Sequence, residues 1–542
     1  MKQQHTAVSS SMAEGEELSY GYLPIGINTA SSVLDPGSKH MGSPNGMSIH
    51  GKKTSTSYII FIALFASITS VMAGYCIGAI SGAVLFIIKN LHINAHQEEV
   101  LMASLVLISI VGNMIAGHLA DAIGRKNTMA FAAFVCLIGS IVMGIAPSFG
   151  LLLTGRLLSG ISVGAVYVIV PLYVAEVSPP EIRGTLISLP EISLNFGILL
   201  GYLSGYLLSG LPSNINWRIM LGLGAFPAIL LICGLPFIPE SPRWLVVKGR
   251  LDEARRFLIK ISRDKDDADQ RLEDIVVAAQ QASRSLDSDE KFRDAKQYLS
   301  NKSEHSVPLL DYEVGGQKRS VWSELLWPNA AVRRILIVAM IFQFFNQASG
   351  VPAVLYYSPS IFAAAGIKST NGDLGSTVIV GCSKTVFVLV ATIFVDRTGR
   401  RSLLFISGLG MCTSMAILGT AFLCLNKSSS IIELNVPAGI TSVMAVVAVC
   451  SFVAFFSIGI GPISNLLIAE LFPLKIRAQG MSLSIVLNRS IGGLISLSFL
   501  TLSSAITPAG VFFIFALVSA FFVIFVYTLV PETMGKTLEE IK

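Results

Sequence analysis

Ten amide or charged side chains lie inside long apolar runs of this 542-residue sequence. They are Asn113, Glu191, Asn195, Gln343, Asn346, Gln347, Lys384, Asn465, Asn488 and Arg489. Because such groups are unfavourable in hydrocarbon, we expect them to face the interior of a helical bundle. There, amides and carboxylates can form paired hydrogen bonds with the hydroxyls of a polyhydroxylated solute, or the amides can join neighbouring helices.

The position of two of these amides favours solute binding. Asn346 and Gln347 come just before Gly350 and Pro352, where a helix should be interrupted. Backbone groups freed by such a break must line a cavity or pack within protein. We therefore predict a substrate site in the interior of the bundle. Its predicted residues are Glu191, Asn346, Gln347, Asn465 and Asn488.

Glu191 is also a candidate for proton coupling. It lies about six or seven residues into its apolar run, or ~10 Å at 1.5 Å per residue. An acid at that depth can carry a proton, or can act as a strong acceptor for a solute hydroxyl. Lys384 and Arg489 are candidate counter-charges, and a permanent ion pair would exclude the proton role.

The elements that position these residues follow from composition. Hydrophobic residues make up 52% of the chain and charged residues only 13%, with a mean hydropathy of +0.68. Soluble proteins carry roughly a quarter charged residues, so the composition predicts a multi-pass protein of the lipid bilayer. The small net charge of +5 gives no reason to expect a nucleic-acid partner.

Few other signals point to chemistry. The seven cysteines occur singly, without a CxxC pair, and are expected to be small buried residues. No nucleophile–base set, phosphate-binding loop or metal cluster stands in a plausible context. The sequence therefore predicts no enzymatic activity, no cofactor and no metal.

A membrane-spanning helix needs about 20 apolar residues, and the sequence predicts six such helices on each side of a charged stretch. The predicted spans lie near 58–82, 100–120, 128–147, 150–175, 186–209, 217–237, 334–358, 376–396, 402–424, 438–466, 480–504 and 509–530. The predicted parts are a disordered cytoplasmic tail (1–57), an N-terminal six-helix bundle (58–237), a cytoplasmic loop with short amphipathic helices (238–333), a C-terminal six-helix bundle (334–530) and a cytoplasmic tail (531–542).

Lys and Arg gather in one set of loops, which places those loops and both termini in the cytoplasm. Within the central loop, apolar residues recur every three to four positions and predict an amphipathic helix packed under the bundle. These residues are Trp244, Val247, Leu251, Ala254, Leu258 and Ile261.

The two halves carry similar motifs at matching places. Segment 117–126 is similar to 396–401, segment 176–184 to 470–477, and segment 239–240 to 531–532. A duplicated six-helix unit is typical of transporters that rock around a site at the bilayer midplane. The predicted fold class is therefore all-α, with twelve transmembrane helices in two pseudo-symmetric halves.

The charges of these motifs predict a cytoplasmic gate. Ion pairs at the membrane edge can close the inner ends of helices against each other, although the charges can also serve topology alone. The predicted gate residues are Asp121, Arg125, Arg156, Glu176, Arg183, Glu240, Asp396, Arg400, Glu470 and Arg477.

Four motifs together carry a family resemblance. They are the segment 117–126, Pro-Glu-Ser-Pro-Arg-Trp at 239–244, Asp-Arg-Thr-Gly-Arg-Arg at 396–401 and Pro-Glu-Thr-Met-Gly-Lys-Thr at 531–537. The sequence resembles the sugar porters of the major facilitator superfamily, and within them the plant polyol and monosaccharide transporters. The resemblance implies a major facilitator fold in the plasma membrane, with the segment around Gln347 holding a small polyol or monosaccharide. A monomer is expected to suffice, because the pathway lies within one chain.

Three spans differ from the family pattern. Cys76 stands where proton-coupled sugar porters carry an Asp, and a thiol would not cycle protons at cytoplasmic pH. In the seventh span Asn346 and Pro352 replace the usual Gln and Asn or Asp, and in the tenth Ser464-Asn465 replaces a Trp platform.

The expected function is secondary transport of polyols or monosaccharides by alternating access, as a proton symporter. A facilitative carrier is the first alternative, because Cys76 replaces the acid of the first span. A sensor that keeps the fold but does not transport is the second alternative, motivated by the altered pocket residues.

Overall fold

A computed structural model describes residues 56–179, 182–262, 264–284, 330–425, 438–472 and 477–530. The side chains of Asp396, Asn465, Glu470 and Arg477 lie outside this description, as do both predicted tails up to residue 55 and from residue 531.

The described chain is helical, and twelve of its segments are long and apolar enough to cross a membrane, as predicted. The N-terminal half comprises α1 (Thr56–Leu91), α2 (Ala95–Ile123), α3 (Arg125–Ile145), α4 (Phe149–Val177), α5 (Arg183–Leu207), α6 (Asn216–Gly222) and α7 (Ala225–Gly234). The connecting helices are α8 (Pro242–Val247), α9 (Leu251–Ile261) and α10 (Lys265–Arg284). The C-terminal half comprises α13 (Ala330–Ala348), α14 (Val351–Ala364), α15 (Thr370–Thr398), α16 (Arg400–Leu425), α17 (Ala438–Ile458), α18 (Ile460–Leu471), α19 (Arg477–Ile506) and α20 (Pro508–Leu529).

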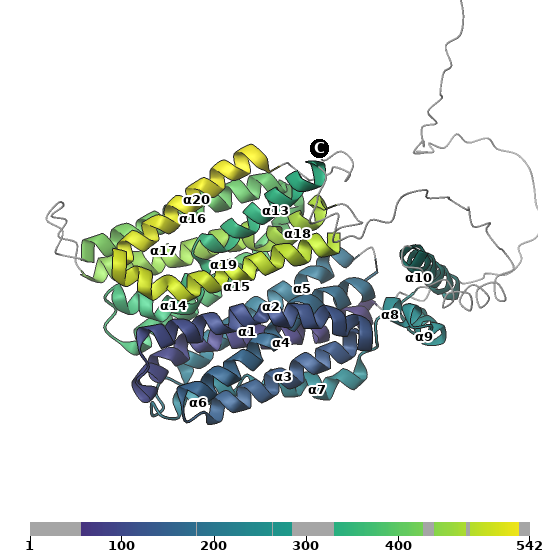
Figure 1. The fold of residues 1–542 in the computed structure, drawn as a ribbon, viewed down its shortest axis with the longest axis horizontal. Helices are drawn as coiled ribbons and strands as arrows, with labels where there is room; N and C mark the ends of the chain where they lie inside the picture. The colour runs from purple at the N-terminus through teal and green to yellow at the C-terminus, as the bar shows by residue number, and fades with distance from the viewer. Residues whose placement is uncertain are drawn as a thin grey trace, which may run out of the picture. The chain divides into compact units, whose positions relative to one another are not determined.

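The two halves lie side by side, with the earlier helices in purple to blue and the later ones in green to yellow (Figure 1). They meet along α2 with α19 and along α5 with α15. We call the end of the bundle where α2 gives way to α3, at Gly124, the motif end. The end where α1 gives way to α2, between Leu91 and Ala95, is called the opposite end.

Helix breaks occur in the sixth, seventh and tenth spans. In the sixth, predicted as one helix, α6 ends at Gly222 and α7 begins at Ala225. The predicted interruption at Gly350 is confirmed: α13 ends at Ala348, and Gly350 adopts a φ of +96° before α14 begins. The tenth span, predicted as one helix, is also broken, at Gly459. There Ser407 satisfies the freed backbone groups, because its Oγ donates to Phe455 O at 2.7 Å and accepts from Ile460 N at 3.4 Å.

Close helix packing fixes α5 against α1. A Cβ on Gly78 would come within 2.4 Å of Ile198 O, and a Cβ on Gly201 would come within 2.5 Å of Ala79 N. Small residues allow such backbone approach in membrane bundles. This contact sets the position of Glu191, which lies on α5.

The predicted amphipathic helix of the central loop is two helices, α8 and α9, separated by Gly249 at a φ of +76°. Because of this break, the apolar residues of α8 and α9 do not form one continuous helix face. Val247 is therefore 53% exposed, whereas Trp244 and Leu251 are buried. The prediction was wrong on Val247. Trp244 Nε1 donates to Asp121 O at 3.1 Å and so holds α8 against the motif end.

Candidate functional site

A cavity of about 150 Å³ lies between the two halves beside the break of the seventh span. Four of the five predicted binding residues line it, and the fifth, Asn465, lies outside the described side chains. Its polar and aromatic lining consists of Tyr167, Glu191, Gln343, Asn346, Gln347, Tyr356, Lys384, Phe456, Ser464, Asn488 and Arg489.

Four amides on one wall of the cavity form a hydrogen-bonded network between α13 and α19. Asn488 Nδ2 donates to Gln343 Oε1 at 2.8 Å and to Asn346 Oδ1 at 3.2 Å. Gln347 Nε2 donates to Asn346 Oδ1 at 2.9 Å and to Asn488 Oδ1 at 3.1 Å. In the described part of the chain, Asn346 Nδ2, Gln343 Nε2 and Gln347 Oε1 form no hydrogen bond. Donors and an acceptor therefore remain free for a solute.

Glu191 faces the amides from α5. Its Oε1 accepts a hydrogen bond from Asn195 Nδ2 at 3.1 Å. Among the described residues, neither Lys384 nor Arg489 comes within 4.0 Å of its carboxylate, so a permanent ion pair is absent there. Arg489 instead places its guanidinium 3.9 Å from the ring centre of Tyr167. The carboxylate is thus free to act as an acceptor in the cavity.

Arg156 lies outside the motif end, contrary to its predicted place in a cytoplasmic gate. It is 0% exposed and lies near the start of α4, twenty residues before Glu176, or about 30 Å at 1.5 Å per residue. Its Nη1 donates to Cys76 O at 2.6 Å, beside the contact of Cys76 Sγ with Cys136 Sγ at 3.5 Å. Charge alone cannot tell an arginine at a helix end from one that binds a backbone carbonyl in the core.

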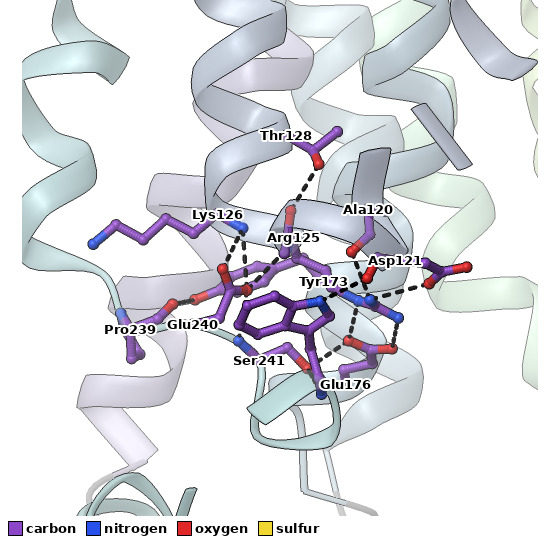
Figure 2. A network of polar contacts seen from close by, with 12 residues as sticks. Ala120, Asp121, Arg125, Lys126, Thr128, Tyr173, Glu176, Pro239, Glu240 and Ser241 are labelled. Carbon is purple, nitrogen blue, oxygen red and sulfur yellow. Dashed lines mark hydrogen bonds and ion pairs between the residues drawn. The ribbon is translucent and has the colours of Figure 1, made fainter. Parts of the chain in front are cut away.

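The motif end carries a network of ion pairs and hydrogen bonds around Arg125 (Figure 2). Arg125 pairs with Glu176 through Nε at 2.9 Å and Nη2 at 3.0 Å, and reaches Asp121 through Nη1 at 3.2 Å. Glu240 accepts hydrogen bonds from the backbone N–H groups of Arg125 and Lys126 at 2.9 and 3.1 Å. Its carboxylate therefore caps the N-terminus of α3, where negative charge is favoured.

Gly124 is required for this cap. It adopts a φ of +100°, and a Cβ at this position would lie 2.3 Å from Glu240 Oε2. The glycine at this position of the motif 117–126 thus allows the Glu240 carboxylate to approach the start of α3 closely.

The ion pairs of Arg125 with Glu176 and Asp121 lie within the N-terminal half. Arg183 donates to Ser178 O at 3.1 Å, and Arg400 begins α16 in the C-terminal half. The remaining predicted members, Asp396, Glu470 and Arg477, lie outside the described side chains.

Comparison with known proteins adds to this geometry. Residues 62–542 match the family described as "Sugar (and other) transporter". The chain belongs to the sugar transporter family. It is 45% identical to "Probable polyol transporter 4" of Arabidopsis thaliana over 90% of this chain and 84% of the relative, and 42% identical to "Polyol transporter 5" of the same plant over 89% and 85%. It is also similar in structure to the "proton:xylose symporter XylE" from E. coli bound to 6-bromo-6-deoxy-D-glucose, with a TM-score of 0.67 and 26% identity over 90% of this chain and 98% of that one.

Gln343, Tyr167 and Tyr356 line the cavity of this sugar transporter family member but were not among the predicted site residues. Gln343 shares a helix face with Asn346 and Gln347, because it lies three and four residues before them, and that spacing could have found it. Tyr167 and Tyr356 line the cavity from α4 and α14. No sequence signal separates these two tyrosines from ordinary aromatic residues of an apolar span.

Proposed function

We propose that this transporter moves a polyol or a monosaccharide across the membrane by alternating access. The observation that carries the proposal is the cavity between the halves, where an amide network and the carboxylate of Glu191 face each other beside a helix break. Hydroxyls of a polyol both donate and accept hydrogen bonds, which matches the free groups of Gln347, Asn346 and Glu191. The names of the Arabidopsis relatives support a polyol.

The solute would enter the existing network and bridge the halves. Asn346, Gln347 and Asn488 belong to the C-terminal half, whereas Glu191 and Tyr167 belong to the N-terminal half. A solute that contacts both sides favours the state in which the halves are close around it, and this differential binding drives the conformational change. The tyrosine rings offer apolar faces for the C–H surface of a sugar.

We also propose proton symport with Glu191 as the proton site. The name of the structural relative, a proton:xylose symporter, supports coupling. Cys76 supplies no carboxylate in the first span, and Glu191 is the acid that lines the cavity in the described part of the chain. A facilitative carrier is the alternative that the coupling experiment tests.

The proposed setting is the plasma membrane, with the motif end and both termini in the cytoplasm. The excess of Lys and Arg in the loops of the motif end supports this orientation. In this setting Arg125, Glu176, Asp121 and Glu240 form the N-terminal part of a cytoplasmic gate. A monomer suffices, because one chain supplies the whole cavity.

The test is uptake of labelled sorbitol, xylitol, myo-inositol and glucose into proteoliposomes, with and without an inward proton gradient. We expect saturable uptake that the gradient raises and a protonophore abolishes. Equal uptake in both conditions would establish a facilitative carrier. Absence of uptake of all four solutes would contradict the proposed function and favour a sensor.

Glu191→Gln tests the proposed proton site. We expect gradient-driven uptake to be lost while the protein still reaches the membrane, because the amide cannot exchange a proton. Glu98→Gln is the matched control, since Glu98 is a buried acid of α2 that does not line the cavity. Normal gradient-driven uptake by Glu191→Gln would refute its role.

A further inference from the structure

A buried carboxylate joins the two halves at the opposite end. Glu99, in the first turns of α2, is 1% exposed. Its Oε1 accepts a hydrogen bond from the backbone N–H of Thr501 at 2.7 Å, and its Oε2 accepts one from the Thr501 hydroxyl at 2.8 Å. Thr501 lies on α19, so both bonds cross from the N-terminal to the C-terminal half.

These two bonds are charge-assisted, which makes them stronger than hydrogen bonds between neutral groups. They satisfy a buried carboxylate whose other described contact is with Nδ1 of the exposed His96, 3.7 Å from Oε2. Two other described hydrogen bonds join the halves towards this end. Ser209 Oγ donates to Asn371 Oδ1 at 2.9 Å, and Tyr202 Oη donates to Leu355 O at 2.7 Å. Both are neutral, so each stabilises contact of the halves less than the charge-assisted bonds of Glu99 do.

A second contact lies between Glu99 and the cavity. Along α2 and α19, Leu107 packs against Gly493, where a Cβ would lie 2.3 Å from Leu107 Cδ2. This contact is about two turns, or roughly 12 Å, deeper than the pair of Glu99 and Thr501 on both helices. The neighbouring Val106 and Arg489 already line the cavity. A solute moving between the opposite end and the cavity along these helices must therefore separate both contacts.

We propose that Glu99 is a positioning residue that latches the opposite end closed. Its release from Thr501 then accompanies the opening of this end, and water replaces Thr501 around the carboxylate. The proposal rests on the proposed function only in that it assumes alternating access between two states. It assigns Glu99 no contact with the solute.

Hydrogen–deuterium exchange of the full-length chain in nanodiscs tests the latch without a transported solute. Weakening the latch in Glu99→Gln should shift the population toward the state open at the opposite end. We expect faster exchange in peptides of α2 and α19 at the opposite end, reaching past Leu107. Slower exchange is expected at the motif end, around 117–126, because one end closes as the other opens.

The controls separate a latch from local packing. Thr501→Val removes the hydroxyl and keeps the backbone N–H, so the same shift should appear at reduced size. Glu98→Gln neutralises the adjacent buried acid, which forms no hydrogen bond or ion pair across the halves among the described residues, and should exchange like the parent. Faster exchange confined to the segment around Thr501, or an equal change in Glu98→Gln, would overturn the proposal. Thr501→Val carries the test if Glu99→Gln does not fold.

The uptake assay stays separate from this test. If the parent chain shows no uptake but Glu99→Gln shows the reciprocal exchange shift, the proposed function is contradicted and the latch is supported. Normal uptake in the parent with no reciprocal shift in either variant would refute the latch alone.

Discussion

Arg156 is fully buried, and its Nε and Nη2 have no hydrogen-bond partner within the described part of the chain. Its nearest polar contact is the carbonyl of Cys76, whose thiol cannot neutralise the guanidinium as a carboxylate would. We predict that Cys76→Asp stabilises the protein by about 1–3 kcal/mol, because a carboxylate would provide acceptors for both free nitrogens.

The measurement is the thermal midpoint of unfolding of the purified variant. Cys76→Ser is the control, since it has similar size without the charge, and no rise is expected. If the thermal midpoint of Cys76→Asp is equal to or below that of Cys76→Ser, the Arg156 guanidinium already has other hydrogen-bond partners and the prediction is wrong.

Asn488 is the centre of the amide network, with three hydrogen-bond partners on α13. We predict that Asn488→Leu abolishes uptake and destabilises the protein by about 1–3 kcal/mol, because buried amides are left without partners. Asn113→Leu is the matched control. Both amide atoms of Asn113 are buried and have no partner in the described residues, so its removal should leave stability unchanged or higher. Equal losses in both variants would mean that the network has no special role.

The residue types and spacing alone placed Glu191, Asn346, Gln347 and Asn488 around one cavity, because intramembrane polar groups must face the interior. The sequence could not place Arg156, since its partner is a backbone carbonyl eighty residues away. Which amides bond to each other depends on the register of α13 against α19, which no local pattern encodes.

At the scale of elements, Gly350 joins α13 to α14 in a left-handed conformation, and a Cβ there would lie 2.6 Å from Phe515 Cδ2. We predict that Gly350→Ala destabilises the protein by about 1–3 kcal/mol through backbone strain, with a further loss from displacing the ring of Phe515. Thermal unfolding measures the effect. Gly439→Ala is the control. Its added methyl group would meet no atom within 4 Å, so its thermal midpoint should equal that of the parent. A midpoint for Gly350→Ala that matches the control would show that the break tolerates a side chain.

The breaks at Gly350 and Gly459 carry similar sequence signals, but only the first was predicted. Gly350 is followed by Pro352, and together they disfavour a continuous helix. Gly459 is followed by Gly461 and Pro462, a pattern of the same kind that also disfavours a continuous helix. Its break depends on Ser407, which is distant in sequence and satisfies the freed groups.

At the scale of the whole molecule, the repeated motifs predicted two halves, and the fold confirms them. Which end of the bundle is closed could not be predicted, because the sequence encodes both states of an alternating-access cycle. The structure shows contacts between the halves at the opposite end, at Glu99 with Thr501 and at Ser209 with Asn371. A transporter must break both contacts in every cycle.

Ser209 and Asn371 allow that requirement to be tested directly. Ser209 Oγ lies 2.9 Å from Asn371 Oδ1, Ser209 is half-buried and Asn371 is exposed, and small movements at these helix ends would bring paired cysteines to the geometry of a disulfide. We predict that oxidised Ser209→Cys/Asn371→Cys loses uptake and that reduction restores it, because the cross-link prevents the halves from separating at this end. Each single variant should transport normally under the same oxidant. Full cross-linking with undiminished uptake would show that the opposite end need not open, and would contradict alternating access around this cavity.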